Sequence, residues 1–332
     1  MKQSLIGLGF FSVLAISALL IFSFFSINNF YSPGPLRAET TVIIPSGQSL
    51  SRISQHLAKD NIISQAWLFT WHVRLRGRGA ALKAGEYSFS KHISPQEILA
   101  KMLKGECVIH QFTIPEGLTT RDIIRMLNLK DDLKNEIKTD IQEGRLFPET
   151  YYYTLKDDRN ILIGRMRLAM TKTLQRLWAT RSQGLPFKSS YEALILASIV
   201  EKETGLAQER ARIAGVFINR LRKGMPLQSD PTVAYGCFHL EQRPVKTLSH
   251  AELQKPTPYN TYLNMGLPPT PICNPGKEAI QAVLHPLKTE ELYFVADGTG
   301  AHIFSKTYEE HKKHHQQWRK IFKQRKQSQL QE

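Results

Sequence analysis

An uncharged, strongly apolar run extends from Ser4 to Ile27, directly after the short sequence MKQ. A helix rises about 1.5 Å per residue, so this run is long enough to cross a hydrocarbon core of about 30 Å. A cleaved signal peptide is the alternative, because Lys2 supplies a positive charge ahead of the run. However, the apolar regions of signal peptides span only about 7–15 residues, and the following NNFYSPGPL offers no convincing cleavage site. We therefore predict an uncleaved anchor over residues 4–27, with a cytoplasmic N-terminus and an exported remainder.

The net charge of +15 indicates an acidic or polyanionic environment for the exported part. Nucleic acid, an anionic membrane surface and an acidic wall polymer all fit this charge, and export argues against nucleic acid as a partner. The three cysteines, Cys107, Cys237 and Cys273, lack CxxC spacing, so no zinc site is expected. Two alternatives stay open for Cys237 and Cys273, namely a disulfide in an oxidising compartment or unpaired, partly buried thiols.

Two related segments follow a linker over residues 29–40, which contains Pro, Gly and Ser. IPSGQSLSRISQHL (44–57) aligns without gaps with IPEGLTTRDIIRML (114–127). Each copy predicts a strand end, a Pro-Gly turn, an N-cap hydroxyl at Ser49 or Thr119, and an amphipathic helix. Together the two copies indicate a small α+β module, and chance similarity between two common helix-start patterns is the alternative.

The rest of the chain is predicted to be mainly helical. Residues 161–180 have the pattern of a long amphipathic helix, and Ser189 or Ser190 is placed to cap a helix that contains LILASIVEKET (194–204). A third helix is predicted over ERARIAGVFINRLRKGM (209–225).

A long segment rich in Pro, Gly, Asn, Tyr and Thr extends from Pro226 to Gly276, and long loops on a helical scaffold often carry function. Residues 292–296, a turn at 297–300 and a return strand are then predicted to form a β-hairpin. The basic tail (311–327) has the pattern of a helix with a solvent-exposed face.

In LILASIVEKET an apolar helix runs into two glutamates, Glu201 and Glu203. At about 100° per residue, Glu201 shares a face with Leu194 and Ala197, whereas Glu203 falls on the opposite side. Burial disfavours a charged carboxylate and raises its pKa, so Glu201 would be available as a general acid near neutral pH. The alternative is a structural Glu201 paired with one of the arginines Arg210, Arg212 or Arg220.

Several motifs resemble, in the same order, those of the endolytic murein transglycosylase family. They are FTIPEG (112–117), LFPETYYY (146–153), LILASIVEKET, GVFINRLRKGMPLQSDPTVAYG (215–236), TPYNTYLNMGLPPTPICNPG (257–276) and HPLKTEELYFVADGTGAHIFSKTYEEH (285–311). The resemblance covers about residues 42–311 and implies a single-pass inner-membrane enzyme that cuts peptidoglycan glycan strands. It also implies a LysM-like N-terminal module, which residues 41–90 match.

The resemblance implies single-acid chemistry without a metal or cofactor. Glu201, the first glutamate of IVEKET, would protonate the oxygen between N-acetylmuramic acid and N-acetylglucosamine. Its carboxylate would then take the proton of the muramyl C6 hydroxyl, which closes onto C1 to give a 1,6-anhydro end. Glu203 is expected to matter much less. The candidates for substrate binding are Glu149, Tyr151, Asn219, Gln228, Asp230, Thr232, Tyr235, Tyr259, Asn260 and Tyr262.

Each of these candidates has a structural alternative, such as turn initiation by Asp230 or loop hydrogen bonding by Asn260. The overall expectation is an α+β protein with a tip and anchor over 1–28, a linker over 29–40, a LysM-like module over 41–110, and a catalytic domain over 111–332. Its expected role is to terminate nascent glycan strands from the periplasmic side, beside peptidoglycan synthases. Two other functions stay open: a glycan-binding module that does not need Glu201, and a muramidase-type hydrolase with Asp230 as its second carboxylate.

Overall fold

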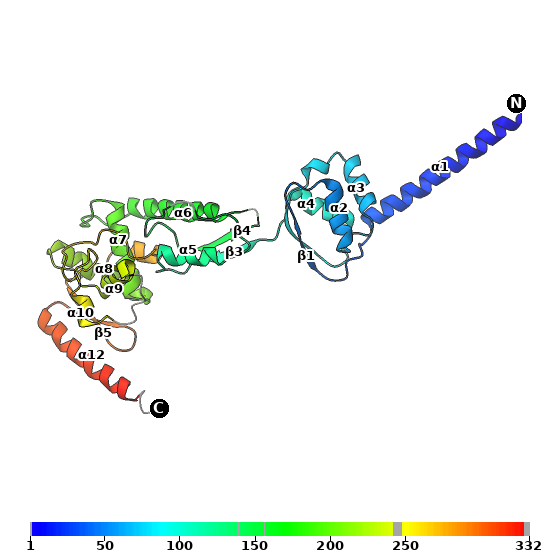
Figure 1. Ribbon diagram of the computed structural model, residues 1–332. Helices are drawn as coiled ribbons and strands as arrows, with labels where there is room; N and C mark the ends of the chain where they lie inside the picture. The colour runs from blue at the N-terminus through cyan, green and yellow to red at the C-terminus, as the bar shows by residue number, and fades with distance from the viewer. Residues whose placement is uncertain (1, 138–139, 156, 242–247, 329–332) are drawn as a thin grey trace. The chain divides into compact units, whose positions relative to one another are not determined.

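The computed structural model describes residues 2–137, 140–155, 157–241 and 248–328, and within them the chain forms mostly helices and three separate two-stranded sheets (Figure 1). The chain divides into two compact units. The first comprises Met1–Gln111 with Tyr152–Asp157, and the second comprises Phe112–Tyr151 with Asp158–Glu332. The architecture is thus mixed helix and sheet, as expected from the sequence.

The first unit begins with the apolar helix α1 (Lys2–Tyr31), which contains a stretch, Phe10–Tyr31, long and apolar enough to span a membrane. The helix continues into the predicted linker because its last turns pack on α3 (Ala66–Leu75). Ser26 and His72 form a buried hydrogen bond of 2.8 Å, and the ring of Phe30 stacks on His72 at 4.2 Å. The end of α1 is therefore part of the core of the first unit.

The remainder of this unit follows the order β1 (Thr40–Ile44), α2 (Leu50–Lys59), α3, the 3₁₀ turn η1 (Gly79–Ala81), β2 (Gly85–Phe89) and α4 (Pro95–Lys104). The strands β1 and β2 are antiparallel, with Val42 opposite Tyr87. Both residues lie in the buried core with Leu57 of α2 and Ile98 of α4. Alternating apolar residues of β1 thus face the helices, as the period of a half-buried strand requires.

Next along the chain come β3 (His110–Thr113), α5 (Thr120–Asn128) and β4 (Thr150–Tyr153), with β3 paired to β4; each of these two strands has residues in both units. Thr119 caps α5 by accepting a hydrogen bond from the Asp122 amide, just as Ser49 caps α2 through the Arg52 amide. Both copies of the aligned sequence therefore form the predicted strand, turn and capped helix.

The second unit is built around α7 (Ser190–Glu203), whose N-cap is Ser189, one of the two predicted caps. This helix packs against α6 (Arg159–Ala179), α8 (Ala207–Arg222), α9 (Asp230–Glu241) and α11 (Lys277–Leu284). Every residue from Ala193 to Val200 is buried, because neighbouring helices cover α7 on several sides. The apolar composition of this helix follows from that surrounding contact.

The unit ends with α10 (His250–Leu253), the antiparallel hairpin of β5 (Tyr293–Ala296) and β6 (His302–Ser305), and α12 (Tyr308–Ser328). The hairpin confirms the sequence prediction. The segment 226–276, predicted to be irregular, instead contains α9 and α10 among its described residues. Pro231 lies in the first turn of α9, where its missing N–H breaks no helical hydrogen bond, so this proline does not prevent a helix.

The structure also decides between the two alternatives for the cysteines. Cys107, Cys237 and Cys273 are all free, and the last two are buried. The Cys273 thiol donates to the carbonyl oxygen of Ser198 in α7 at 3.3 Å, so it is packed on a helix and not on Cys237. The disulfide is therefore wrong and the thiols are unpaired.

Candidate active site

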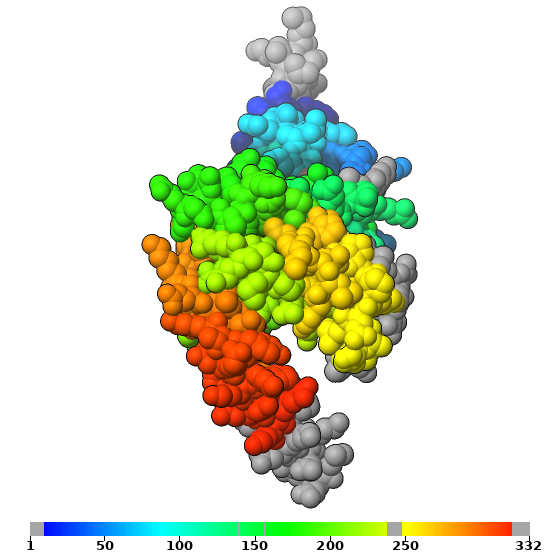
Figure 2. Space-filling view, turned by 90° about the vertical axis from the view of Figure 1, so that its left-hand side faces the viewer, coloured from blue at the N-terminus to red at the C-terminus, as the bar shows by residue number. Residues whose placement is uncertain are grey.

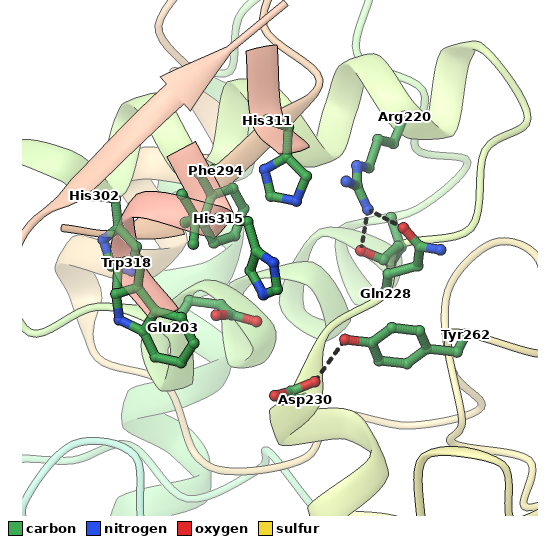
Figure 3. A pocket seen from close by; sticks show the side chains of 13 residues that line it. Glu203, Arg220, Gln228, Asp230, Tyr262, Phe294, His302, His311, His315 and Trp318 are labelled. Carbon is green, nitrogen blue, oxygen red and sulfur yellow. Dashed lines mark hydrogen bonds between the residues drawn. The ribbon is translucent and has the colours of Figure 1, made fainter. Parts of the chain in front are cut away.

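A pocket of about 400 Å³ lies at the C-terminal end of α7, with Glu203 in its wall (Figure 3). Residues of α8 and of the segment entering α9 form one side, and the β5–β6 hairpin and α12 form the other. Figure 2 shows the surface hollowed between α12, drawn in red, and the yellow segment of the same unit. The pocket is therefore a surface feature of the second unit that a large ligand could enter.

Glu203 is held by a short hydrogen bond from the Ser229 hydroxyl, which donates to Oε1 at 2.5 Å. Burial raises the pKa of Glu203 to about 7, and the negative charge of Asp230 acts in the same direction. The Ser229 hydrogen bond and the nearby His302 and Arg220 oppose this rise in pKa. A carboxyl group with a pKa of about 7 is substantially protonated at neutral pH, as a general acid requires.

Ser229 is itself positioned by buried hydroxyl groups. Its amide donates to Thr261 Oγ1 at 3.0 Å, and its carbonyl accepts from Thr232 Oγ1 at 2.7 Å. The preceding Gln228 has a φ of 52°, a left-handed conformation that is uncommon for a residue other than glycine. The Gln228 amide donates to the Thr261 carbonyl at 3.0 Å, which holds this turn in place.

The wall opposite the hairpin is polar. Asp230, the first residue of α9, accepts a hydrogen bond of 2.6 Å from the Tyr262 hydroxyl. Arg220 is buried and donates to the carbonyl oxygens of Leu292 at 2.6 Å and Leu227 at 2.8 Å. Arg220 thereby joins α8 to the hairpin and to the turn before Ser229.

On the other side of the pocket, His302 of β6 is fixed by Glu209 of α8. The His302 amide and the ring Nδ1 lie 2.9 and 2.7 Å from the two oxygens of the Glu209 carboxylate. Both side chains are largely buried. This pair holds the hairpin against α8, so that His302 lines the same pocket as Glu203.

Glu201 has a different environment, outside the residues that line the pocket. Its Oε2 accepts a hydrogen bond of 2.8 Å from the Gly276 amide, and Oε1 lies 4.0 Å from Arg210 Nη2. Arg210 also lies 3.9 Å from Glu116, in the IPEG turn. Burial raises the pKa of Glu201, and the Gly276 hydrogen bond opposes this effect. The raised pKa agrees with the predicted general acid. The position of Arg210 agrees with the alternative, a structural glutamate paired with an arginine.

Glu203 lies on the side of α7 opposite Glu201, as the helical period predicts, and other segments cover that side. The two glutamates do point to different sides of α7, but the Ser229 turn and the β5–β6 hairpin cover the side of Glu203. The side chain of Glu201 is only 6% exposed, because the IPEG turn and the start of α11 cover it. The Glu201 side chain is therefore almost fully buried, whereas Glu203 is half-buried and borders the pocket.

Three of the predicted substrate-binding residues, Gln228, Asp230 and Tyr262, line the pocket. Thr232 lies behind it and supports Ser229. Two asparagines bond to backbone: Asn219 donates to the Thr289 carbonyl at 2.7 Å, and Asn260 to the Leu253 carbonyl at 2.9 Å. The others also lie outside the pocket lining, namely Glu149, Tyr151, Tyr235 and Tyr259.

All three candidate tyrosines outside the pocket lining have structural partners. The Tyr151 hydroxyl donates to the Phe147 carbonyl at 2.7 Å, and that of Tyr235 donates to Glu143 at 3.2 Å. The Tyr259 hydroxyl lies 2.9 Å from Thr270 Oγ1. Sequence reasoning missed Ser229 and the ring-bearing residues of α12, because nothing local in the sequence shows that these segments meet at Glu203.

The chain has close relatives among known proteins. The profile of the YceG-like family matches residues 42–317. An endolytic murein transglycosylase of Bacillus subtilis (strain 168) is 31% identical, over 83% of this chain and 84% of that protein. An endolytic murein transglycosylase of Streptococcus pneumoniae serotype 2 (strain D39 / NCTC 7466) is 32% identical over 80% of this chain, which spans only 55% of that protein.

A solved structure is also similar. The crystal structure of a putative yceG-like protein from Listeria monocytogenes is 33% identical and superposes with a TM-score of 0.53. The similarity covers 83% of this chain and 98% of that one. The likeness extends through both compact units, since it covers most of the chain.

Proposed function

The chain belongs to the YceG-like family, and on that premise we propose that it cleaves peptidoglycan glycan strands endolytically by lytic transglycosylation. The names of the relatives support the reaction class and the substrate. The observation that carries the site is the carboxyl group of Glu203, whose pKa is raised to about 7 in the wall of an open pocket.

Glu203 would act first as a general acid. With Oε1 held by Ser229, the proton on Oε2 would be transferred to the glycosidic oxygen between N-acetylmuramic acid and N-acetylglucosamine. The C1–O bond breaks as that oxygen becomes a hydroxyl group. The Glu203 carboxylate then accepts the proton of the muramyl C6 hydroxyl, whose oxygen bonds to C1. The new end is a 1,6-anhydro sugar, the reaction consumes no water, and Glu203 recovers its proton.

The prediction that Glu201 supplies the acid stays untested; the likeness to the family supports Glu201, and the contacts in the described pocket support Glu203. The two oxygens of Glu201 face the Gly276 amide and Arg210, which are structural partners of the kind expected for a buried carboxylate. Glu203 combines a single hydroxyl partner on Oε1 with direct access to the pocket. Proton transfer needs hydrogen-bond reach to the substrate oxygen, and Glu203 meets this condition for a ligand in the described pocket.

A muramidase-type hydrolase is the second candidate, and Asp230 is the observation that favours it. Asp230 is a second carboxylate in the same pocket as Glu203, and glycoside hydrolases use paired carboxylates. Its oxygen accepts a hydrogen bond from Tyr262, so under our proposal Asp230 positions the substrate and helps keep Glu203 protonated.

Digestion of purified sacculi separates these mechanisms. The full chain, solubilised in detergent, is incubated with sacculi, and the released muropeptides are weighed by mass spectrometry. Ends lighter than reducing ends by one water are expected, whereas reducing ends would establish hydrolysis. Absence of cleavage would leave only glycan binding.

Two matched variants assign the acid. Glu203→Gln is expected to lose at least about 100-fold in rate, which is the usual contribution of a general acid. Glu201→Gln keeps an oxygen for the Gly276 amide and is expected to retain most of the activity. The reverse result, an inactive Glu201→Gln beside an active Glu203→Gln, would restore the sequence assignment.

We further propose that α1 anchors the chain in the cytoplasmic membrane through its exposed apolar residues ahead of Ser26, with the second unit on the periplasmic side. The order β1, α2, α3, β2 after the anchor is consistent with a LysM-like, glycan-binding module in the first unit. An anchored endolytic enzyme beside peptidoglycan synthases would terminate nascent strands. Removing residues 1–25, which leaves the buried Ser26 and Phe30 in place, is expected to release the protein from membranes in a fractionation experiment.

A further inference from the structure

Helix α3 of the first unit has an exposed face of mostly aromatic and apolar side chains. Trp67, Trp71, Arg74 and Leu75 follow the i, i+4, i+7, i+8 spacing of one helix face, and all four are exposed. Trp67 is 54% exposed and Leu75 is 65% exposed, although tryptophan is highly buried on average in folded proteins. The opposite side of the helix is buried in the unit. The four exposed residues, here called the α3 face, therefore need a partner outside the core of the unit.

The α3 face meets α1 where the exposed apolar stretch of that helix ends. Phe22 of α1 stacks on Trp67 with ring centroids 6.2 Å apart, and it meets Trp71 edge-on at 5.7 Å. Figure 1 shows α3 beside the last turns of α1. Every residue from Phe10 to Phe25 is exposed, whereas Ser26, one turn after Phe22, is buried. The α3 face thus lies at the level where α1 passes into the core of the first unit.

Helix α1 also indicates where a membrane surface would lie on this unit. Residues 4–25 are uncharged and would extend about 33 Å at about 1.5 Å per residue, close to the hydrocarbon thickness of about 30 Å. Phe22 lies near the end of that run, so Trp67 and Trp71 lie at the boundary between acyl chains and headgroups. Tryptophan is enriched at this boundary, because its ring is apolar and its N–H group is polar.

The charges on α3 lie farther from the membrane than its rings. Since Phe22 contacts Trp67 and Tyr31 accepts a hydrogen bond of 3.1 Å from Arg76, α3 runs away from the spanning part of α1. Arg74 and Arg78 are exposed, and their side chains have no hydrogen-bond or ion-pair partner among the described residues. Residues 61–85 contain no Asp or Glu. Unpaired guanidinium groups therefore follow the aromatic rings at the depth of lipid phosphates.

We propose that the α3 face, together with Arg78, seats the first unit on an anionic phospholipid surface. The rings of Trp67 and Trp71 lie between acyl chains and headgroups, and Arg74 and Arg78 bind headgroup phosphates. This proposal rests on the proposed membrane anchor, and it is independent of which glutamate supplies the acid. Anionic lipid attracts basic residues beside a membrane span, and long basic side chains reach along apolar surface to the headgroups. A second copy of the chain fits this face less well, because it would bring like charges together.

The first test measures contact between the rings and lipid. The full chain is reconstituted in vesicles of phosphatidylcholine and phosphatidylglycerol whose acyl chains carry bromine, which quenches tryptophan fluorescence on contact. Trp178→Phe combined with Trp318→Phe leaves Trp67 and Trp71 as the only tryptophans. Their emission is expected to fall by about half or more relative to vesicles without bromine, because indole rings at the interface contact acyl chains. Emission that does not change on bromination would overturn the proposal.

A complementary variant covers the case in which this double variant fails to fold, as judged by circular dichroism. Trp67→Phe combined with Trp71→Phe keeps the tryptophans of the second unit. The quenched part of the emission is then the difference between the natural chain and this variant. An equal loss of emission in the two proteins would overturn lipid contact by α3.

The second test measures the preference for anionic lipid. Vesicles of one composition carry the bromine either on phosphatidylglycerol or, at the same mole fraction, on phosphatidylcholine. Quenching is expected to be at least about twofold greater with brominated phosphatidylglycerol, since one arginine near an anionic surface favours it about fivefold. Arg74→Gln combined with Arg78→Gln is expected to bring this ratio towards one. Arg167→Gln combined with Arg176→Gln removes the same charge from exposed positions of α6, and is expected to leave the ratio unchanged. A ratio of one in the parent would overturn headgroup binding.

The anchor and the α3 face fail in distinguishable ways. A chain that does not float with the vesicles in a density gradient would refute the anchor, and the α3 face with it. A chain that floats while Trp67 and Trp71 stay unquenched would refute the α3 face alone. Chemical crosslinking between two floating chains through α3 would then identify a second copy as the occupant.

Discussion

The hydrogen bond from Ser229 to Glu203 should set the upper pH limit of the reaction. The Ser229 hydroxyl donates to Glu203 Oε1 at 2.5 Å, and this contact favours the charged form of the acid. Ser229→Ala removes the donor while leaving the backbone hydrogen bonds of residue 229 to Thr261 and Thr232 available. The pKa of Glu203, now about 7, should therefore rise in the variant.

The size of the change follows from the energy of the contact. A hydrogen bond to a charged group contributes about 1.5–3 kcal/mol, and one pKa unit corresponds to about 1.4 kcal/mol. The upper limit is thus a rise of about one to two units. Since the same hydroxyl also bonds to the protonated acid, though more weakly, we expect about one unit.

The assay is the pH dependence of kcat/KM for release of muropeptides from sacculi. Activity needs protonated Glu203, so the rate falls as pH rises through the pKa of the free enzyme. In Ser229→Ala this descending limb should move about one pH unit upward. Ser189→Ala is the matched control, because Ser189 caps the other end of α7. It should lower stability by about 1 kcal/mol without moving the limb.

A descending limb that stays in place, or moves to lower pH, in a folded Ser229→Ala protein would refute the reasoning. The same limb moving in Ser189→Ala would show that general destabilisation, and not the hydroxyl group, controls the profile.

Three other predictions concern stability and the thiols. The pKa of Glu203 is raised from 4.5 to about 7, so the folded state binds more protons than the unfolded state between these values, and stability falls as pH rises through that window. Glu203→Gln should therefore be more stable than the wild type by about 3 kcal/mol at pH 8 and equal to it at pH 4, as measured by urea unfolding. An equal gap at both pH values contradicts this prediction. Gly215→Ala should lower the free energy of unfolding by about 1–3 kcal/mol, because a Cβ would lie 2.5 Å from the Leu287 carbonyl oxygen. At Gly164 a Cβ meets nothing within 4 Å, so Gly164→Ala should stabilise α6 by about 0.5–1 kcal/mol. Thermal unfolding compares the two variants, and equal effects would count against the packing argument. Without reductant but in denaturant, all three cysteines should be alkylated, and a mass showing fewer than three labels would reveal a disulfide.

Local pattern was sufficient for several elements of this fold. The apolar run, the capped helices after β1 and β3, the helix that begins after Ser189 and the β5–β6 hairpin are all present as predicted. Each depends on interactions between residues close in sequence, such as a hydroxyl group that caps an amide three residues on. Such contacts form in the same way whatever packs on the finished element.

The sequence alone determined that two glutamates end a buried helix and point to different sides of it, because the helical period sets that angle. Only the tertiary structure decided which of them borders a pocket. The segments that surround Glu203 lie far along the chain: the turn at Ser229, the hairpin with His302, and α12 with Trp318. A helical period says which residues share a face, but what covers that face depends on long-range packing. The catalytic assignment of Glu201 therefore stays a prediction, and the folded chain adds only that Glu203 borders the described pocket.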